Sequence, residues 1–112
     1  MAPIKSYTDM EQSQKLAEFL PIENADITLH VPIIGKRITE WDIPCWSLAA
    51  LLNILPTIDD RNAEFCKDIR CDKWHIYYHA TATLPVIDTD RYENLVDACY
   101  EMILKLHKLK ML

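Results

Sequence analysis

Three histidines, His30, His75 and His79, come closest in type and spacing to a metal site. His75 and His79 are four residues apart in a segment whose alternation predicts a strand, and four residues of strand span about 13 Å. That distance is too long for both side chains to ligate one zinc ion at about 2.1 Å. His30 could approach one of them if the two strands pair, with Asp or Glu completing the site. We therefore expect solvated or hydrogen-bonded histidines, and no bound metal or other cofactor.

The cysteines and histidines between residues 66 and 79 also include the residue types of a zinc finger. Their order is Cys66-x4-Cys71-x3-His75-x3-His79. A Cys2His2 finger separates its cysteine pair from its histidine pair by about twelve or more residues, which leaves room for a hairpin and a helix turn. Only three residues intervene here, so the spacing does not predict a finger.

Cys45 is the candidate for a reactive thiol, because the pattern around it predicts a helix N-terminus. The free N–H groups and the positive dipole end of a helix favour a thiolate. A cysteine hydrolase also needs a nearby histidine and a group that orients it, and nothing in the sequence places one beside Cys45. The residues that follow are the most apolar of the chain. We therefore expect a buried structural thiol and no enzymatic activity.

Composition excludes several classes of protein. The 112 residues carry a net charge of −5, whereas attraction to nucleic acid needs clustered Lys and Arg. The one glycine, Gly35, excludes a phosphate-cradling loop that needs several, and no small-molecule substrate is indicated. We find no signal-peptide pattern and no apolar stretch near the ~20 residues that span a bilayer. We therefore expect a cytoplasmic protein that does not bind membranes and whose four cysteines stay reduced.

Hydrophobic patterning predicts three helices, of which the first two lie in the N-terminal half. The first covers residues 9–19, where Thr8 and Glu11 have the spacing of a capping box. The second begins at Asp42–Pro44, since proline is tolerated in a first turn. It continues from Cys45 to Leu55 and is apolar nearly all round, as expected for a helix at the centre of the domain.

The third predicted helix begins at Asp90, with Glu93 at capping-box spacing. Its apolar residues recur at steps of three and four, which is typical of an amphipathic helix. The stripe consists of Tyr92, Leu95, Val96, Cys99, Met102, Ile103, Leu106 and Leu109.

Strict alternation predicts strands at residues 25–31 and 73–83, and a further short strand is expected near Phe65. In the segment 73–83, Trp74, Ile76 and Tyr78 share one face, whereas His75, Tyr77, His79 and Thr81 share the other. The chain therefore predicts a single α+β domain over residues 1–112, with three helices packed on a small antiparallel sheet in the order αβα(β)βα.

Three segments of the chain, Ser13–Pro21, Ile43–Asn53 and Asn94–His107, together cover the predicted helices. They resemble a group of short uncharacterised proteins encoded in gut-bacterial genomes, often near prophage or mobile-element genes. The group has no activity that carries over to any residue. The resemblance implies a small bacterial accessory protein.

The functional expectation is a small non-enzymatic binding or protein-interaction domain. The candidate binding surface is the strand face that carries His75, Tyr77, His79 and Thr81, because a small sheet with an uncovered face and edge often pairs with another chain. That pairing would be homodimerisation or docking of a host protein. The alternative is a metal-binding or cysteine-dependent activity that uses His30, His75 and His79, or Cys45.

Overall fold

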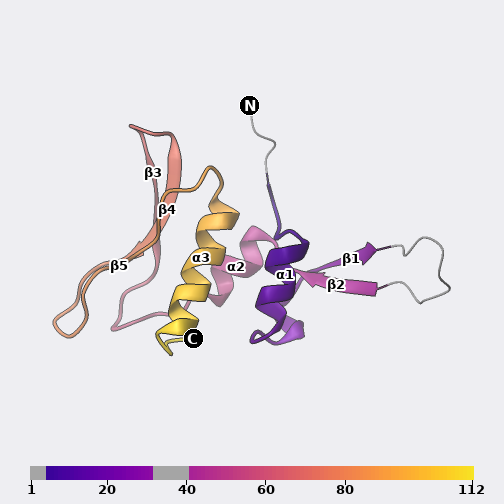
Figure 1. The fold of residues 1–112 in the computed structure, drawn as a ribbon. Coiled ribbons are helices and arrows are strands. Elements are labelled where there is room, and N and C mark those ends of the chain that lie inside the picture. The colour runs from indigo at the N-terminus through magenta and orange to yellow at the C-terminus, as the bar shows by residue number, and fades with distance from the viewer. Residues whose placement is uncertain (1–4, 32–40) are drawn as a thin grey trace.

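The computed structural model describes residues 5–31 and 41–112 and has a mixed α+β fold. Three helices lie between a two-stranded sheet and a three-stranded sheet (Figure 1). The elements are α1 (Met10–Ala17), the short 3-10 helix η1 (Ile22–Asn24), β1 (Ile27–Val31), β2 (Trp41–Cys45), α2 (Leu48–Ile54), β3 (Glu64–Asp68), β4 (Lys73–Tyr78), β5 (Ile87–Asp88) and α3 (Leu95–Lys108). The predicted fold class is confirmed, and the order differs by two additional strands, β2 and β5.

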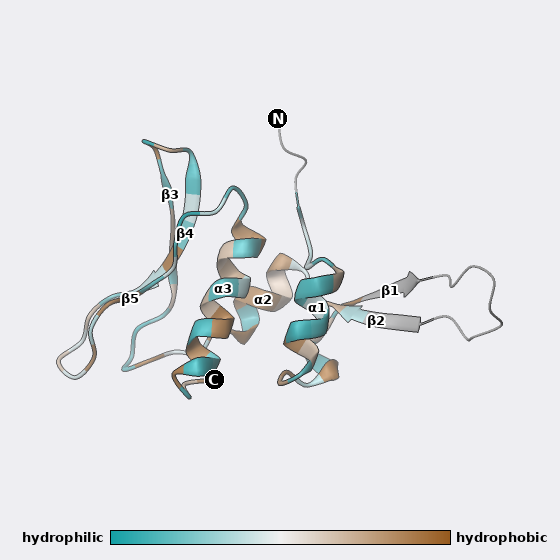
Figure 2. Cartoon of the chain, viewed as in Figure 1, coloured by the Kyte–Doolittle hydropathy of each residue, from teal (hydrophilic) through white to brown (hydrophobic). Residues whose placement is uncertain are grey.

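Helix α3 is the central element of the core and packs against both α2 and β4. Its apolar bands alternate with polar ones along the ribbon (Figure 2). The predicted stripe is confirmed for five fully buried residues, which are Val96, Cys99, Met102, Ile103 and Leu106. Complete burial of such a side chain stabilises the fold by about 1.5–3 kcal/mol. Leu109 departs from the stripe and is half exposed, because the helix has ended at Lys108.

The N-terminus of α1 lies one residue later than the Thr8–Glu11 spacing predicts. The capping residue is Asp9, whose side chain accepts a hydrogen bond from the Gln12 N–H at 2.8 Å, while the Gln12 side chain accepts from the Asp9 N–H. Thr8 is instead fully buried and accepts a hydrogen bond from the Trp46 backbone N–H. Because its hydroxyl is bonded to the distant Trp46, Thr8 does not cap the helix, and the adjacent Asp9 does.

The start predicted for the second helix at Asp42–Pro44 is wrong, because this segment belongs to strand β2. It pairs antiparallel with β1, and Pro44 lies opposite Thr28. Proline cannot donate a backbone hydrogen bond, but each strand of a two-stranded sheet has a free edge on which it is tolerated. Helix α2 begins after Ser47, whose side-chain oxygen accepts from the Ala50 N–H.

The third helix also begins later than predicted, since Asn94 and not Asp90 is its capping residue. The Asn94 side chain accepts a hydrogen bond from the Asp97 N–H at 2.8 Å. Residues 91–93 cannot enter the helix because Tyr92 pairs with Trp74, exchanging two backbone hydrogen bonds of 2.6 and 2.8 Å. Extended pairing to β4 thus overrides the local capping signal.

The strand of residues 25–31 does not pair with the strand of residues 73–83, which was the condition for bringing His30 close to His75 or His79. The two strands belong to different sheets, since β1 pairs with β2 while β4 lies between β3 and β5. His30 lies opposite Asp42 in the β1–β2 ladder. The fold therefore does not bring His30 across a ladder from His75 or His79.

Candidate functional site

The alternation of β4 sets the two faces of the three-stranded sheet. Ile76 and Tyr78 point into the core and are buried, so the alternate residues His75 and Tyr77 point outward. Cross-strand register places Cys66 opposite His75, and both Glu64 and Asp88 opposite Tyr77. We call these five residues, Glu64, Cys66, His75, Tyr77 and Asp88, the outer sheet face.

Aromatic rings stack along β4 on the outer sheet face. The ring centroids of His75 and Tyr77 are 5.2 Å apart with the planes inclined by 20°. The ring of His79, just beyond the strand, is nearly perpendicular to that of Tyr77, with the two centroids 5.1 Å apart. The sequence prediction that these three side chains share one face is confirmed by this ladder of rings.

Each histidine of the ladder has a carboxylate partner. His75 Nδ1 lies 2.9 Å from Asp88 Oδ1, and His79 Nε2 is paired with Glu64. The expectation of hydrogen-bonded histidines is therefore confirmed for His75. Across residues 5–31 and 41–112, no group of three or more His, Cys, Asp or Glu is arranged to hold a metal ion.

Tyr77 lies at the centre of this face. Burial raises the pKa of its phenol, and the negative charges of Glu64 and Asp88 raise it further. A neutral phenol between two imidazoles offers an apolar ring with one polar end. Such side chains are enriched where proteins contact one another.

Thr81 lies away from the outer sheet face, although the alternation placed it there. Strand β4 ends at Tyr78, and the Thr81 hydroxyl donates to the Asp59 carboxylate at 2.9 Å. Thr83 donates to the same oxygen at 2.6 Å, and the two bonds lower the pKa of Asp59. Asp59 and Asp60 both have positive φ, as the tight turn between Ile58 and Arg61 requires. Thr81 therefore orders a turn.

Strand β3 is an edge strand whose outward backbone groups follow from the hydrogen bonds of β4. Trp74 and Ile76 use their backbone groups on the β5 side, with Tyr92 and with Thr89 respectively. In an antiparallel ladder, residues opposite these two form the pairs without mutual hydrogen bonds. Those residues are Lys67 and Phe65, in that order. Their N–H and C=O groups thus point away from β4.

The β3 edge is accessible along its length. Every residue from Glu64 to Lys67 is exposed, and Phe65 shows 52% of its surface. Within the described chain, no strand pairs with the outer side of β3. Sequence reasoning located a short strand near Phe65 but could not identify it as the edge, because strand order is decided by pairing with distant residues.

Cys45 lies at the end of β2 and is fully buried. Helix α2 begins two residues further on, with Ser47 as its capping residue, so the predicted place of Cys45 at a helix N-terminus is wrong. The burial of Cys45 and Cys99 agrees with small core residues, whereas Cys66 and Cys71 are exposed.

A polar hollow of about 680 Å³ lies between residues 88–92 and α3. Its charged residues comprise three acids and three bases, Asp88, Asp90, Glu101, Arg91, Lys105 and Lys108. Several already pair with one another or with the backbone: Arg91 lies 3.6 Å from Asp88, and Lys105 donates to the Asp88 carbonyl at 2.5 Å. Balanced charge gives the hollow no preference for an anion or a cation.

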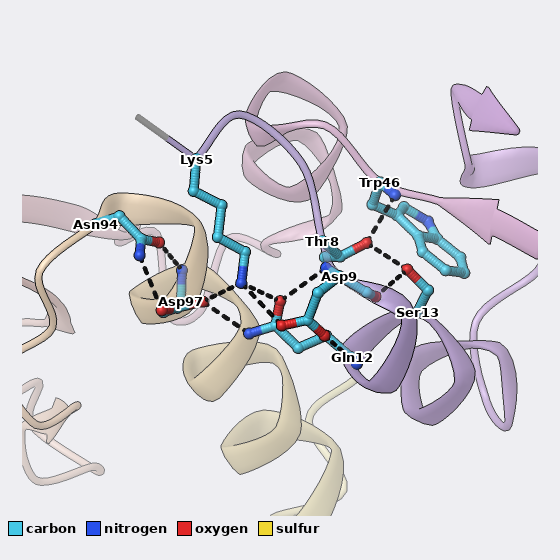
Figure 3. A network of polar contacts seen from close by, with 8 residues as sticks. All are labelled: Lys5, Thr8, Asp9, Gln12, Ser13, Trp46, Asn94 and Asp97. Carbon is cyan, nitrogen blue, oxygen red and sulfur yellow. Dashed lines mark hydrogen bonds and ion pairs between the residues drawn. The ribbon is translucent and has the colours of Figure 1, made fainter. Parts of the chain in front are cut away.

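The network around Asp97 is a second polar cluster, which sequence reasoning missed (Figure 3). Asp97 accepts hydrogen bonds from Lys5 at 2.7 Å, Gln12 at 2.8 Å and Asn94 at 2.9 Å. Beside it, Thr8 bonds to Ser13 at 2.8 Å. Because both carboxylate oxygens of Asp97 accept hydrogen bonds from other residues of the chain, we interpret the network as stabilising the fold.

Comparison with known proteins adds no assignment to this geometry. No protein-family model, curated protein or solved structure matches the chain. In the described parts of the chain, no helix has the length and apolar character that crossing a membrane requires.

Proposed function

We propose that the protein is a small non-enzymatic protein-interaction domain that self-associates by adding a strand to the β3 edge. The observation that carries the proposal is the outward direction of the Phe65 and Lys67 backbone groups on an exposed strand. A row of N–H and C=O groups without a strand beside it is a template for pairing with another chain. Backbone pairing supplies affinity, and side chains on the two faces supply specificity.

The outer sheet face supports the same proposal. Its ring ladder of His75, Tyr77 and His79 is one strand away from the β3 edge. An incoming strand would extend the sheet and bring its own side chains beside Glu64 and Cys66. Natural edge strands often carry charges that discourage pairing. Strand β3 carries three, Glu64, Lys67 and Asp68, which limit the registers in which a second strand can pair.

The cellular setting proposed here rests on sequence alone. The three helical segments resemble short proteins encoded near prophage or mobile-element genes, and the chain lacks the basic clusters of nucleic-acid binders. We therefore propose a cytoplasmic bacterial accessory protein whose partners are protein chains.

Sedimentation velocity over a range of concentrations tests the interaction. We expect the wild type to shift from monomer towards dimer as concentration rises. Lys67→Pro should weaken association by about tenfold or more, because proline removes an outward N–H and its ring obstructs the incoming strand. The β3–β4 ladder should survive, since the Lys67 N–H does not bond to β4.

Lys67→Ala is the matched control, because it removes the same charge and keeps the backbone N–H. It should associate within about threefold of the wild type, as expected for a change at an exposed position. Circular dichroism would establish that both variants are folded. A wild type that remains monomeric at every concentration contradicts the proposal.

A further inference from the structure

We infer that the occupant of the β3 edge is a second copy of this chain, paired antiparallel about a two-fold axis that passes through Phe65. The inference rests on the proposed function and adds to it the symmetry axis and the register of the two strands. Two copies of β3 related in this way would join the two three-stranded sheets into one continuous six-stranded sheet.

Symmetry limits the possible registers. A closed homodimer uses the same surface on both copies. When two identical antiparallel strands pair about an axis perpendicular to the sheet, one residue must face its own copy. The exposed positions of β3, any of which could lie on this axis, are Glu64, Phe65, Cys66 and Lys67.

Charge excludes three of these four registers. Like charges directly opposite each other on neighbouring strands are destabilising. An axis at Glu64 opposes two carboxylates, and an axis at Lys67 opposes two ammonium groups. An axis at Cys66 places Glu64 of each copy opposite Asp68 of the other, which creates two repulsive pairs.

An axis at Phe65 opposes no like charges. Glu64 then faces Cys66 of the other copy, and Lys67 faces Ala63. Glu64 and Asp68 of the other copy are only diagonal neighbours of Glu64, at about 7–8 Å. Each Glu64 already has His79 of its own chain as a partner. Charge complementarity thus selects one register.

The properties of Phe65 fit a position on the axis. Its backbone groups point outward, so the two copies can exchange a pair of hydrogen bonds there. Its ring is 52% exposed and lies 6.3 Å from Trp74. Pairing would cover both Phe65 rings with each other, and aromatic cross-strand pairs are among those that stabilise sheets.

Disulfide cross-linking of the full chain tests the register. In the double variant Glu64→Cys/Cys71→Ser, the new cysteine should lie directly opposite the native Cys66 of the other copy. In the control variant Cys71→Ser, the two Cys66 residues are diagonal neighbours, too far apart to form a disulfide. With diamide as oxidant, we expect the double variant to form covalent dimers at least about tenfold faster than Cys71→Ser. Cys45 and Cys99 are buried and stay in both backgrounds.

The outcomes separate the register from the proposed function. Equally fast cross-linking of Cys71→Ser would move the axis to Cys66 and overturn the inference, while leaving the interaction domain in place. A wild type that dimerises in sedimentation while the double variant fails to cross-link overturns the register in the same way. A monomeric wild type overturns both the register and the proposed self-association. The β3 edge would then be available only for a strand from a different protein.

A second pair of variants tests the axis without cysteines. Phe65→Asp should weaken dimerisation at least about tenfold, because it opposes two carboxylates on the axis. Phe65→Leu keeps an apolar residue there and should retain the dimer. Equal dissociation constants for these two variants would be incompatible with an axis at Phe65.

Discussion

The ammonium group of Lys5 lies 2.7 Å from the carboxylate of Asp97, although the two residues are 92 positions apart. This contact joins the segment that precedes α1 to the first turn of α3 (Figure 3). Gln12 of α1 donates to the same oxygen at 2.8 Å. One carboxylate thus holds the N-terminal segment and α1 against the first turn of α3.

Removing the Asp97 charge should destabilise the fold in a pH-dependent way. Burial opposes its ionisation, but hydrogen bonds from Lys5, Gln12 and Asn94 outweigh burial and lower its pKa. Its contribution is therefore present above the ordinary carboxyl value of about 4 and is lost as pH falls through the lower folded value. Asp97→Asn should reduce the free energy of unfolding at pH 7 by about 1–3 kcal/mol, measured by urea denaturation, with a smaller difference in acid.

Glu101 provides a control of opposite sign for Asp97. Burial, together with the charges of Asp90 and Asp97, raises its pKa, so its ionised form disfavours the fold at neutral pH. Glu101→Gln should leave stability at pH 7 unchanged or higher. A loss equal to that of Asp97→Asn would show that removing any carboxylate from this region destabilises the fold.

Thr8 should be sensitive to substitution because its hydroxyl has two buried partners. Its oxygen accepts from the Trp46 backbone N–H at 3.1 Å and bonds to Ser13 at 2.8 Å. Thr8→Val keeps the shape but removes the acceptor of the Trp46 N–H and leaves Ser13 with only its bond to the Asp9 carbonyl. The loss should cost about 1–3 kcal/mol in free energy of unfolding. Thr57→Val, at an exposed position, should change it by less than about 0.5 kcal/mol. Thermal denaturation would measure both, and equal effects would count against this role for Thr8.

Local pattern predicted the elements whose burial repeats along the chain. Met102 and Leu106 lie in the stripe of α3, and Ile76 and Tyr78 alternate into the core from β4. Both patterns depend on which side of one element faces the core. The spacing of apolar residues within that element is enough to predict this side.

Features decided by distant residues were not predictable in the same way. Threonine and aspartate are both good capping residues. Asp9 caps α1 because the Thr8 hydroxyl is already bonded to the Trp46 N–H. Asp90 has the same signal as Asn94, but Tyr92 is held extended by Trp74. The β3 edge, which carries the candidate site, likewise exists only because β4 lies between β3 and β5.

Tyr78 should make stability depend on pH in the alkaline range. Its hydroxyl donates to the Pro56 carbonyl at 2.7 Å, and burial raises its pKa to about 12. Because this folded value exceeds the ordinary value of about 10, the contribution is present below pH 10 and is lost as pH rises towards 12. Tyr78→Phe should cost about 0.5–1.5 kcal/mol at pH 7 and weaken the alkaline loss. Denaturation at pH 7 and pH 11 measures both, and an unchanged alkaline loss would assign it to other groups.

The four cysteines should fall into two classes of reactivity towards a thiol reagent near neutral pH. Cys66 and Cys71 are exposed and should be labelled in the folded protein, whereas Cys45 and Cys99 are buried and should react only on unfolding. Burial also raises the pKa of Cys99 to about 12, so its thiolate is scarce even when the chain opens locally. Mass spectrometry of peptides after timed labelling would measure the four rates, and urea-unfolded protein is the control in which all four should react. Rapid labelling of Cys45 in the folded state would contradict a structural thiol and return cysteine chemistry to consideration.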